Sequence, residues 1–525
     1  MSQSLINALQ HPALFDHPVA RFKVIETHIS WVLLTGEFAY KIKKPVDFGF
    51  LDFSTLEKRE FFCHEELRLN RRLAPQLYLE VVPIGGIPDA PKLGASTGVF
   101  EYAVKMRQFE ESARLDHLLA NQKLTPAHID QLADELAAFH QEIAVAGSKD
   151  KFGGADLVYH FVDENFLQIR PLLEAGENRQ QRMQLDDIEQ WCRQSIGALK
   201  ETIDLRKRDG FVRECHGDAH LANMVLLGRD VVLFDCLEFN PDLRWIDVIS
   251  ELAFAIMDLD DRGRSDFGSR LLDRYLQRTG DYAGLKLLRF YQVYRACVRA
   301  KVAALRLQQA GEDAAPESDW EEFCGYLDLA ESYTHRTQPV VVCCHGVSGS
   351  GKTTVSQQLL ENLPLIRIRS DVERKRLFGL SLEAKTPESD KGTVYGAEAT
   401  RRTFARLEEL ARGIVEAGFG VIVDATFLRR MERQQFADLA REYELPFRLM
   451  EISAPEDVLR ERVRKRASDS NDASEAGLEV LLQQLDFREP LSAEEGRNAV
   501  SVDTAGAPDL EPLLAGLKSV IYGKH

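Results

Sequence analysis

The sequence predicts two domains, an N-terminal α+β domain with two lobes and a C-terminal α/β domain with a parallel sheet. Three observations lead to this fold class. The chain has 525 residues, whereas a single hydrophobic core stops growing at roughly 250–300 residues. A β-rich stretch is followed by a long helical one over the first two-thirds of the chain. Apolar strand patterns then alternate with helical patterns to the end, which is typical of a parallel sheet.

The first lobe, residues 20–110, is expected to be β-rich with a single helix. Apolar runs bounded by turn residues predict its strands, which we place at 29–34, 38–44, 78–84 and 100–109. A turn-rich loop over 85–98 separates the last two strands. The helix is expected over 55–73, because Ser54 or Thr55 can cap its start.

Helical patterns dominate the second lobe, residues 111–335. A helical stretch is expected over 125–205, two short strands around a loop over 210–235, and further helices over 246–331. The pattern changes near residue 335. We therefore place one domain at 1–335 and the other at 336–525.

Apolar strands and helices alternate in the second domain. The run 340–344 is apolar throughout, as expected of a strand buried on both faces. Further strands are expected at 365–368, 420–423 and 447–452, with helices between them. This rhythm predicts a parallel sheet with right-handed crossovers.

Composition places the chain among ordinary globular proteins and limits its partners. Hydrophobic residues make up 44% and charged residues 28% of the chain, which excludes the disordered and fibrous classes. The formal net charge is −17, and such an acidic balance repels polyanions in general. We therefore expect a small-molecule partner and not nucleic acid. Neither the identity of that molecule nor the oligomeric state follows from the sequence.

Cysteine usage and the N-terminus indicate a cytoplasmic protein. The eight cysteines are scattered without paired CxxC spacing, so a structural zinc site is not expected. Reduced thiols in a reducing compartment are the simpler interpretation. The first 15 residues lack the basic start and apolar stretch of a signal peptide. No window approaches the ~18 apolar residues of a membrane span, so no membrane segment is expected.

A phosphate-binding motif follows the first strand of the second domain. It matches GxxxxGK[ST] at every fixed position, and its residues are Gly346, Val347, Ser348, Gly349, Ser350, Gly351, Lys352 and Thr353. A helix-like run begins at Thr354, which completes the context that the motif needs. Lys352 can reach the β- and γ-phosphates, and Thr353 can bind Mg²⁺. We therefore expect these residues, with Thr354, to hold ATP and Mg²⁺; the alternative is a glycine- and serine-rich turn without a ligand.

Charged positions downstream indicate phosphoryl transfer. Asp371 follows the second strand at the sheet edge where α/β domains bind ligands, so it can accept a proton from an acceptor hydroxyl. Arg374 lies one helical turn further and can bind the acceptor or a phosphate. Asp424 ends an apolar strand, as a carboxylate that holds Mg²⁺ does. The alternatives are a helix cap with a surface salt bridge for the first pair, and a capping role for Asp424.

A cluster of arginines can form a lid. Arg460, Arg462, Arg464 and Arg466 crowd one short stretch before a polar segment. We expect Arg462 and Arg466 to contact the nucleotide, as a mobile lid over ATP requires. A solvated helix face is the alternative, because these four arginines cannot all point inward.

Together these pieces resemble the small P-loop kinases of the family that includes polynucleotide kinase, adenylylsulfate kinase and zeta-toxin-like enzymes, an AAA-type ATP-binding group. The matching segments are GVSGSGKT at 346–353, SDVER at 370–374, VDATF at 423–427 and RERVRKR at 460–466. The resemblance covers residues 339–523. It implies a P-loop NTPase fold for the second domain.

A second motif lies in the helical lobe, where the letters HGDAHLAN at 216–223 have the spacing H-x-D-x-x-x-x-N. Such a loop places Asp218 at the acceptor hydroxyl and lets Asn223 bind Mg²⁺. Asp235 follows a short apolar strand, where a second metal-binding carboxylate is expected. The alternatives are a plain turn, or a metal site that joins Asp218 to the two histidines of the motif.

Residues 20–335 resemble the aminoglycoside-phosphotransferase and protein-kinase-like family, whose loop carries HGD where protein kinases carry HRD. The resemblance implies a protein-kinase-like bilobal α+β fold for the first domain. It implies that Asp218 is the catalytic residue. It also implies that Asn223 and Asp235 are Mg²⁺ ligands.

In the first lobe, the same resemblance implies a strand lysine that meets the α- and β-phosphates and a helix glutamate that pairs with it. Lys41 and Lys43 point the same way from one strand, so either can be that lysine. Glu66 is the expected partner, and Glu65 is the competing choice. The stretch 100–109 would supply the hinge that meets adenine.

The sequence departs from the family pattern at two places. The first lobe lacks a GxGxxG segment and has only Gly36 in a turn, so the cover over the phosphates differs. Asp235 is followed by Cys236 and Leu237 instead of Phe-Gly. Asp247, further along, is expected to be a buried carboxylate that braces the catalytic loop.

The motifs together predict an ATP-dependent phosphotransferase with two sites, a bifunctional small-molecule kinase that transfers the γ-phosphoryl group to a hydroxyl. The fold and loop indicate the chemistry and not the acceptor. One rival is a P-loop domain that binds nucleotide to regulate the other domain. Another is a nucleic-acid 5′-hydroxyl kinase, for which the basic run Arg374, Lys375 and Arg376 is a hint.

Overall fold

The structure is a computed structural model that describes residues 2–49, 51–174, 178–310, 317–382, 384–467 and 476–523. The chain forms two compact units. The first comprises Met1–Glu164 and Lys200–Asp258, and the second comprises Asn165–Leu199 and Leu259–His525. Helices that precede residue 335 thus share a compact unit with the C-terminal sheet. The expected domain boundary at residue 335 stays a prediction.

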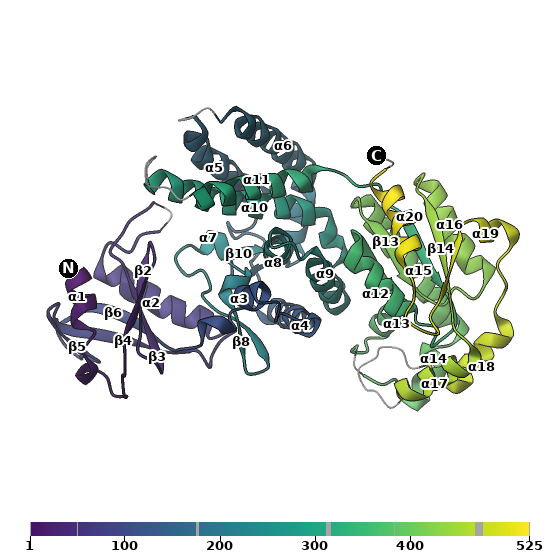
Figure 1. Ribbon diagram of the computed structural model, residues 1–525, viewed down its shortest axis with the longest axis horizontal. Coiled ribbons are helices and arrows are strands. Elements are labelled where there is room, and N and C mark those ends of the chain that lie inside the picture. Colours follow the sequence, from purple (N-terminus) through teal and green to yellow (C-terminus); the bar gives the residue numbers. More distant parts are fainter. Residues whose placement is uncertain are drawn as a thin grey trace. The chain divides into compact units, whose positions relative to one another are not determined.

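A six-stranded antiparallel sheet forms the N-terminal lobe of the first unit, with the order β1-β2-β3-β6-β4-β5 (Figure 1). Its strands are β1 Lys23–Glu26, β2 Ser30–Leu34, β3 Phe38–Lys43, β4 Tyr78–Ile87, β5 Ala90–Leu93 and β6 Val99–Arg107. Helix α1 (Ser2–Ala8) packs on the face that carries Tyr40 and Ile42. Because side chains alternate along a strand, the lysines of β3 point to the other face, toward α2 (Leu56–Asn70).

The loop expected over 85–98 contains a short hairpin. Strand β4 continues to Ile87 and pairs with β5, where Ile84 lies opposite Leu93. Glycines and two prolines in this stretch gave it the appearance of a loop. Pairing with a neighbouring strand outweighs such local preferences.

Four short strands lie in the helical part of the first unit, where two were expected around a loop. The pairs are β7 (Val212–Glu214) with β10 (Trp245–Asp247), and β8 (Met224–Leu227) with β9 (Asp230–Leu233). The helices that surround them are α3 Leu115–Ala120, α4 Pro126–Glu142, α7 Pro241–Arg244 and α8 Val248–Asp261. The prediction that a helix begins at residue 246 was wrong, because pairing with β7 holds that segment extended.

A five-stranded parallel sheet forms the C-terminal part of the second unit, with the order β12-β13-β11-β14-β15. Its strands are β11 Val341–His345, β12 Leu365–Arg369, β13 Gly420–Asp424, β14 Phe447–Ser453 and β15 Ala499–Asp503. The helices around it include α12 Lys352–Asn362, α13 Ser370–Leu377, α15 Ala397–Glu416, α16 Arg430–Glu442, α17 Glu456–Ala467, α18 Leu478–Phe487 and α20 Glu511–Ile521. Helices α12 and α20 pack in one core cluster with the sheet. The predicted parallel sheet is confirmed.

Strand β15 was not predicted. It lies at the sheet edge beside β14, and four of its five residues are not buried, so its apolar signal is weak. Pairing with β14 makes this segment a strand.

Further helices of the second unit precede the sheet in sequence. They are α5 Ala155–Glu174 and α6 Arg179–Arg208, each of which continues from or into the first unit, then α9 Ser265–Thr279, α10 Leu285–Ala310 and α11 Glu317–Thr334. Helices α10 and α11 pack on each other, and α9 packs on α12. No helix in the described part of the chain combines the length and apolar character needed to cross a membrane.

Candidate active sites

The H-G-D turn of the first unit follows β7 and is anchored by its histidine. His216 is completely buried; its Nε2 donates to the Phe234 carbonyl oxygen at 2.9 Å and its Nδ1 accepts the Asp218 N–H at 3.3 Å. Burial lowers the pKa of His216, which favours the neutral ring that these bonds require. Both ring nitrogens are engaged in the fold, which argues against a metal site that uses this histidine.

Gly217 gives the turn its shape. Its φ is +88°, and a β-carbon there would lie 3.2 Å from the β-carbons of Leu237 and Arg244. A side chain would meet both the strain of the left-handed conformation and these neighbours. The middle residue of the motif is therefore glycine for a steric reason.

Glu251 of α8 braces this turn. It is completely buried; Oε1 accepts the N–H groups of His216 at 2.6 Å and Gly217 at 2.9 Å, and Oε2 lies 2.7 Å from Nε2 of His140. Burial alone raises the pKa of Glu251, but the hydrogen bond and charge of His140 outweigh it and hold that pKa at about 2. His140, Cys215 and Glu251 bring possible metal-ligand atoms within 4.8 Å of one another. Hydrogen bonds already occupy both glutamate oxygens, so they account for this cluster.

Asp247 is not the brace that the sequence indicated. It is buried as expected, but its two oxygens pair with Arg206 at 2.7 and 3.0 Å. Oδ1 also accepts the Ile249 N–H at 2.9 Å. Asp247 therefore caps the start of α8, and the acid one helical turn further, Glu251, reaches the catalytic loop.

We expect Glu251→Gln to remove an acid-sensitive part of the protein's stability. The folded-state pKa of about 2 lies below the unfolded value, which is about 4.3 for a glutamate. The carboxylate therefore stabilises the fold at neutral pH, by on the order of 3 kcal/mol, and this contribution is lost as pH falls from about 5 toward 2. Urea unfolding should show a gap between wild type and variant that is widest at neutral pH and narrows in acid. A gap that stays constant with pH would contradict this, and Glu142→Gln on the surface of α4 is the control.

Asp218, Asn223 and Asp235 come together as the motif spacing predicted. Asn223 Nδ2 donates to Oδ2 of Asp218 at 2.8 Å, and the Asn223 carbonyl accepts the Phe234 N–H at 2.9 Å, next to Asp235. Asp235 has a φ of +63°, a conformation that is uncommon outside glycine and recurs at functional sites. The side chains of Asp218 and Asp235 are 38% and 42% exposed, so both carboxylates are open to a ligand.

Both lysines of β3 meet Glu66, which is completely buried. Lys41 Nζ lies 2.9 Å from Oε1 and Lys43 Nζ lies 2.6 Å from Oε2. Lys41 also lies 2.5 Å from Oδ1 of Asp235. Burial lowers the pKa of Lys41, but the carboxylates of Asp235 and Glu66 outweigh it and hold that pKa well above its usual value. The contact with Asp235 favours Lys41 as the lysine that meets the phosphates.

Glu238 is the second partner of Lys43, and sequence reasoning missed it. The Lys43 ammonium donates to Glu238 Oε1, and both side chains are buried. Burial raises the pKa of Glu238, while the carboxylates of Glu238 and Glu66 raise the pKa of Lys43 against the effect of its own burial. The only sequence signal was an acid three residues after Asp235. Lys43 therefore pairs with two buried carboxylates, those of Glu66 and Glu238, whereas Lys41 also contacts the partly exposed Asp235.

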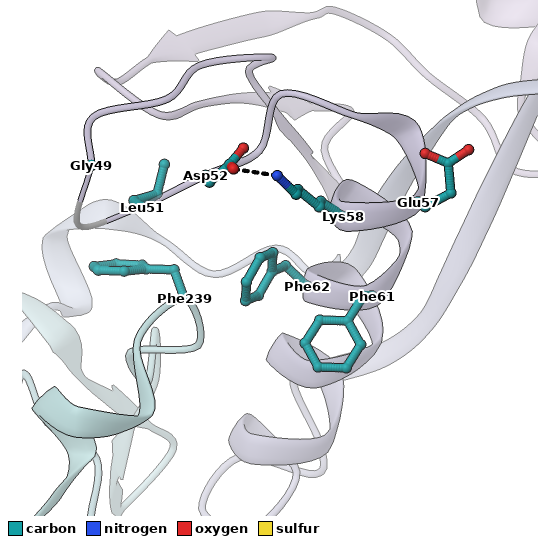
Figure 2. A pocket seen from close by; sticks show the side chains of 8 residues that line it. All are labelled: Gly49, Leu51, Asp52, Glu57, Lys58, Phe61, Phe62 and Phe239. Carbon is teal, nitrogen blue, oxygen red and sulfur yellow. Dashed lines mark hydrogen bonds and ion pairs between the residues drawn. The ribbon is translucent and has the colours of Figure 1, made fainter.

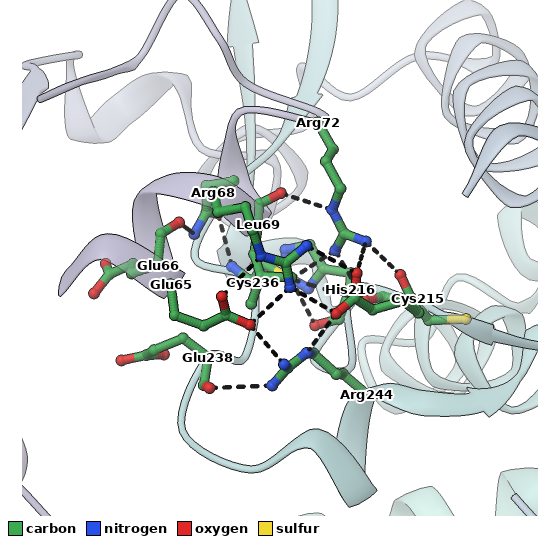
Figure 3. A network of polar contacts seen from close by, with 12 residues as sticks. Glu65, Glu66, Arg68, Leu69, Arg72, Cys215, His216, Cys236, Glu238 and Arg244 are labelled. Carbon is green, nitrogen blue, oxygen red and sulfur yellow. Dashed lines mark hydrogen bonds and ion pairs between the residues drawn. The ribbon is translucent and has the colours of Figure 1, made fainter. Parts of the chain in front are cut away.

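A network of arginines ties α2, which carries Glu66, to the segments around Cys215 and Cys236, next to His216 and Asp235 (Figure 3). Arg72, just beyond α2, donates to the Cys215 carbonyl at 3.2 Å and contacts Sγ of Cys236 at 3.4 Å. Arg244 pairs with Glu65 at 2.7 Å. Glu65 therefore faces this network, and Glu66 is the glutamate that meets the lysines.

An open groove of about 460 Å³ lies beside the first half of α2 (Figure 2). It is lined by Gly49, Leu51, Asp52, Glu57, Lys58, Phe61, Phe62 and Phe239. Figure 2 shows the aromatic rings along it and an ion pair between Asp52 and Lys58 at its edge. None of these residues belongs to the predicted catalytic or nucleotide-binding set.

The P-loop of the second unit connects β11 to α12, as its motif predicted. A β-carbon at Gly346 would lie 2.4 Å from the Ile452 carbonyl oxygen, so glycine is required where the loop leaves the sheet. Lys352 begins α12, and its Nζ donates to the Val347 carbonyl at 2.9 Å. Ser350 Oγ is buried and has no hydrogen-bond partner among the described residues. A buried hydroxyl of this kind is expected where a polar ligand binds.

Thr353 and Asp424 form a pair of hard oxygen ligands at the P-loop. Thr353 Oγ1 donates to Oδ2 of Asp424 at 2.8 Å, and Asp424 is buried at the end of β13. Mg²⁺ prefers carboxylate and hydroxyl oxygens together with phosphate. This donor set therefore fits Mg²⁺.

Asp371 and Arg374 lie on α13, which follows β12. Arg374 is buried, so the surface salt bridge considered as its alternative does not describe it. Its NH1 donates to the Val394 carbonyl at 3.1 Å, its guanidinium lies 5.4 Å from the ring centre of Tyr395, and its Nε has no partner among the described residues. Burial lowers the pKa of Arg374, although the charge of Asp371 partly opposes this. A buried, incompletely bonded guanidinium suits an anionic or hydroxylated ligand.

The next two residues of this basic run are bound within the fold. Lys375 is buried and donates to the carbonyls of Leu382 and Ala384, at 2.8 and 2.9 Å. Arg376 pairs with Glu373. The run that hinted at a nucleic-acid groove is therefore occupied by contacts inside the protein.

Among the described side chains of the predicted lid helix α17, Arg462 is the arginine that contacts the P-loop. Arg462 NH1 donates to the Gly349 carbonyl at 3.3 Å and to Oγ1 of Thr504 at 3.0 Å. Arg460 pairs with an acid one turn earlier on the same helix, as on a solvated face. The side chain of Arg466 lies outside what the structure describes.

Two further residues touch the P-loop and were missed. Gln484 of α18 accepts the Ser348 N–H through Oε1 at 2.7 Å. Thr504, just after β15, donates to the Ser350 carbonyl at 2.8 Å. Neither lies in a motif, so sequence alone gave no signal for them.

Two parts of the chain match the models of known families. Residues 59–291 match the model of the phosphotransferase enzyme family, and residues 341–491 match the model of an AAA domain. Both resemblances expected from the sequence are confirmed. The chain is 29% identical over 475 residues to uncharacterized proteins of Mycobacterium bovis and Mycobacterium tuberculosis, which covers 90% of this chain and 92% of each relative.

Solved structures of kinases also align with parts of the chain. An amicoumacin kinase aligns over 63% of this chain and 96% of its own, with 12% identity and a TM-score of 0.40. A choline/ethanolamine kinase family protein from Mesorhizobium loti aligns over 63% and 94%, with 12% identity and a TM-score of 0.38. A gluconokinase from Sinorhizobium meliloti aligns over 36% and 93%, with 22% identity and a TM-score of 0.23.

Proposed function

We propose that the chain is a phosphotransferase that joins a domain similar to the phosphotransferase enzyme family to an AAA-type P-loop domain, and that each domain holds its own ATP·Mg²⁺ site. Each site would transfer the γ-phosphoryl group to a hydroxyl of a small molecule. The observation that carries this proposal is the open pair of carboxylates, Asp218 and Asp235, with Asn223 on one and Lys41 on the other.

In the first unit, Asp218 takes the proton of the acceptor hydroxyl while the acceptor oxygen forms its bond to phosphorus and the bond to ADP breaks. ATP with Mg²⁺ supplies the phosphoryl group. Asn223 and Asp235 offer the oxygen ligands that Mg²⁺ prefers. Lys41 exchanges its contact with Asp235 for phosphate oxygens, and Glu66 keeps its ammonium in place.

In the second unit, the same chemistry would use a different set of side chains. Lys352 binds the phosphates, and Thr353 and Asp424 hold Mg²⁺. Asp371 accepts the proton of the acceptor hydroxyl. Arg374 binds the acceptor, because its guanidinium has an unused Nε.

A small-molecule acceptor is favoured over nucleic acid for both sites. The net charge of −17 repels polyanions. Lys375 and Arg376 are bound within the fold, so they do not extend a basic surface beside Asp371. We also propose that neither site needs a membrane.

The test is ADP formation by the purified chain with ATP, Mg²⁺ and a panel of hydroxylated metabolites and aminoglycosides. We expect at least one acceptor to stimulate turnover and to appear as its phosphate ester by mass spectrometry. Asp371→Ala should abolish esters made by the P-loop domain and leave ATP binding at 346–357 intact. Slow acceptor-independent hydrolysis that Asp371→Ala leaves unchanged would instead support a regulatory P-loop domain. The exposed Asp438→Ala is the control.

A further inference from the structure

We propose that helix α9 completes the P-loop site, with Asp273 as a positioning residue that acts on Thr353 through Arg367. This inference rests on the proposed ATP·Mg²⁺ site of the P-loop domain. Helix α9 lies some 70 residues before the P-loop in sequence and contains none of the motif residues. It nevertheless packs directly on α12, the helix that begins at Lys352.

The first contact is a buried ion pair between α9 and the sheet. Arg367 lies in the middle of β12 and is 3% exposed, and Asp273 is 7% exposed. The guanidinium donates to both carboxylate oxygens, from Nε at 3.1 Å and from NH2 at 2.6 Å. Such a two-point contact fixes the orientation of the arginine as well as its charge.

The other edge of the same guanidinium holds the start of α12. Arg367 NH1 donates to the Thr353 carbonyl at 3.1 Å and to Ser356 Oγ at 3.1 Å. NH2 also donates to Oε1 of Gln357 at 2.6 Å. The orientation that Asp273 imposes on Arg367 is therefore passed to Thr353, whose hydroxyl would hold Mg²⁺.

A second chain of contacts runs from α9 to Asp424. Gln277 lies one helical turn after Asp273, and its Nε2 donates to Oδ2 of Asp273 at 2.6 Å. Its Oε1 accepts from Arg369 at 3.3 Å, and Arg369 Nε lies 3.5 Å from Oδ2 of Asp424. Because Thr353 donates to the same Asp424 oxygen, the two chains close on the two expected Mg²⁺ ligands.

The buried positive charge of Arg367 explains why the site needs Asp273 of α9. Arg367 without its carboxylate would be an unpaired buried cation, which is strongly unfavourable inside a protein. To regain hydration for its charge, the Arg367 guanidinium would have to move toward water and away from Thr353. Outer partners of metal ligands orient those ligands in this way, and their loss typically weakens a metal site.

Hydrogen–deuterium exchange of the full chain tests the proposal, because the peptide 346–357 reports on the P-loop site alone. Exchange is followed with ATP at increasing Mg²⁺, alongside the thermal midpoint of each variant. Asp273→Asn should need about 10- to 100-fold more Mg²⁺ than wild type for the same protection of this peptide. Asp266→Asn is the matched control, since it makes the same chemical change on α9 at a carboxylate whose ion pair is with Arg264.

Each outcome of this experiment either supports or contradicts the role of Asp273. Equal Mg²⁺ dependence of Asp273→Asn and wild type overturns the proposal. So does an equal loss of protection with and without Mg²⁺, which indicates a merely structural role. If Asp273→Asn does not fold, Gln277→Ala replaces it with the same expected direction. No protection of 346–357 in wild type contradicts the P-loop ATP site itself, and the proposal with it.

Discussion

Asp218→Asn is expected to slow phosphoryl transfer by the first unit by about 10²- to 10⁴-fold, the range that a positioned general base contributes. The amide has the shape of the carboxylate but does not take up the acceptor proton. Its oxygen can still accept the hydrogen bond from Asn223, so the loop keeps its form. The KM for ATP should change little, because Lys41, Asn223 and Asp235 stay in place.

Acceptor-stimulated ADP formation at saturating ATP measures this effect, with the ester product quantified by mass spectrometry. Asp230→Asn, at the exposed start of β9, is the control for the same chemical change in the same unit. A variant that keeps more than about a tenth of the wild-type rate would contradict the assignment of Asp218 as the base, since that loss is too small for a positioned base.

Lys352→Ala is expected to lower transfer by the second unit by about 10²- to 10³-fold, as loss of one preorganised donor to a charged transition state does. The lysine now donates to the Val347 carbonyl, within the loop that would surround the phosphates. Its removal should weaken ATP binding at this loop and leave the first unit's activity untouched, because the two sites share no residue.

Protection of peptide 346–357 by ATP and the rate of ester formation together measure this effect. The exposed Lys518→Ala on α20 is the control for loss of a lysine in the same unit. Unchanged ATP protection together with an unchanged rate would show that Lys352 does not meet the phosphates. If the rate falls for esters that also depend on Asp218, the two sites are not independent.

The fold was predictable where pattern and burial agree. Strands β11 and β13 are buried along their whole length, so their apolar sequences predicted strands of a parallel sheet covered on both faces. The edge strand β15 was missed because only one of its five residues is buried. Strand β10 was missed because it is three residues long and is held by a partner distant in sequence. Local preference is a weak guide where pairing decides the structure.

Some residues of the candidate sites could be predicted from the sequence, and others could not. Asp218, Asn223 and the P-loop lie within continuous motifs, so their spacing was enough to place them together. Glu251, Gln484 and Asp273 act on those motifs from other helices and match no pattern. Asp247 shows the limit most clearly, since burial was foreseen correctly but its partner was not.

Pattern and motif were enough to predict the two domain types and the residues of the two motifs, because the chemistry expected of each motif requires fixed residues at fixed spacing. The tertiary structure then distinguished residues that are neighbours in the sequence. Lys41 contacts Asp235, whereas Lys43 contacts Glu238. Glu66 contacts both lysines, whereas Glu65 pairs with Arg244. Two like residues close together on one strand or helix have the same local sequence signal. Their contacts differ because tertiary packing places different charged groups beside each of them. Lys41 meets Asp235 from 194 residues away, and no local pattern encodes such a contact.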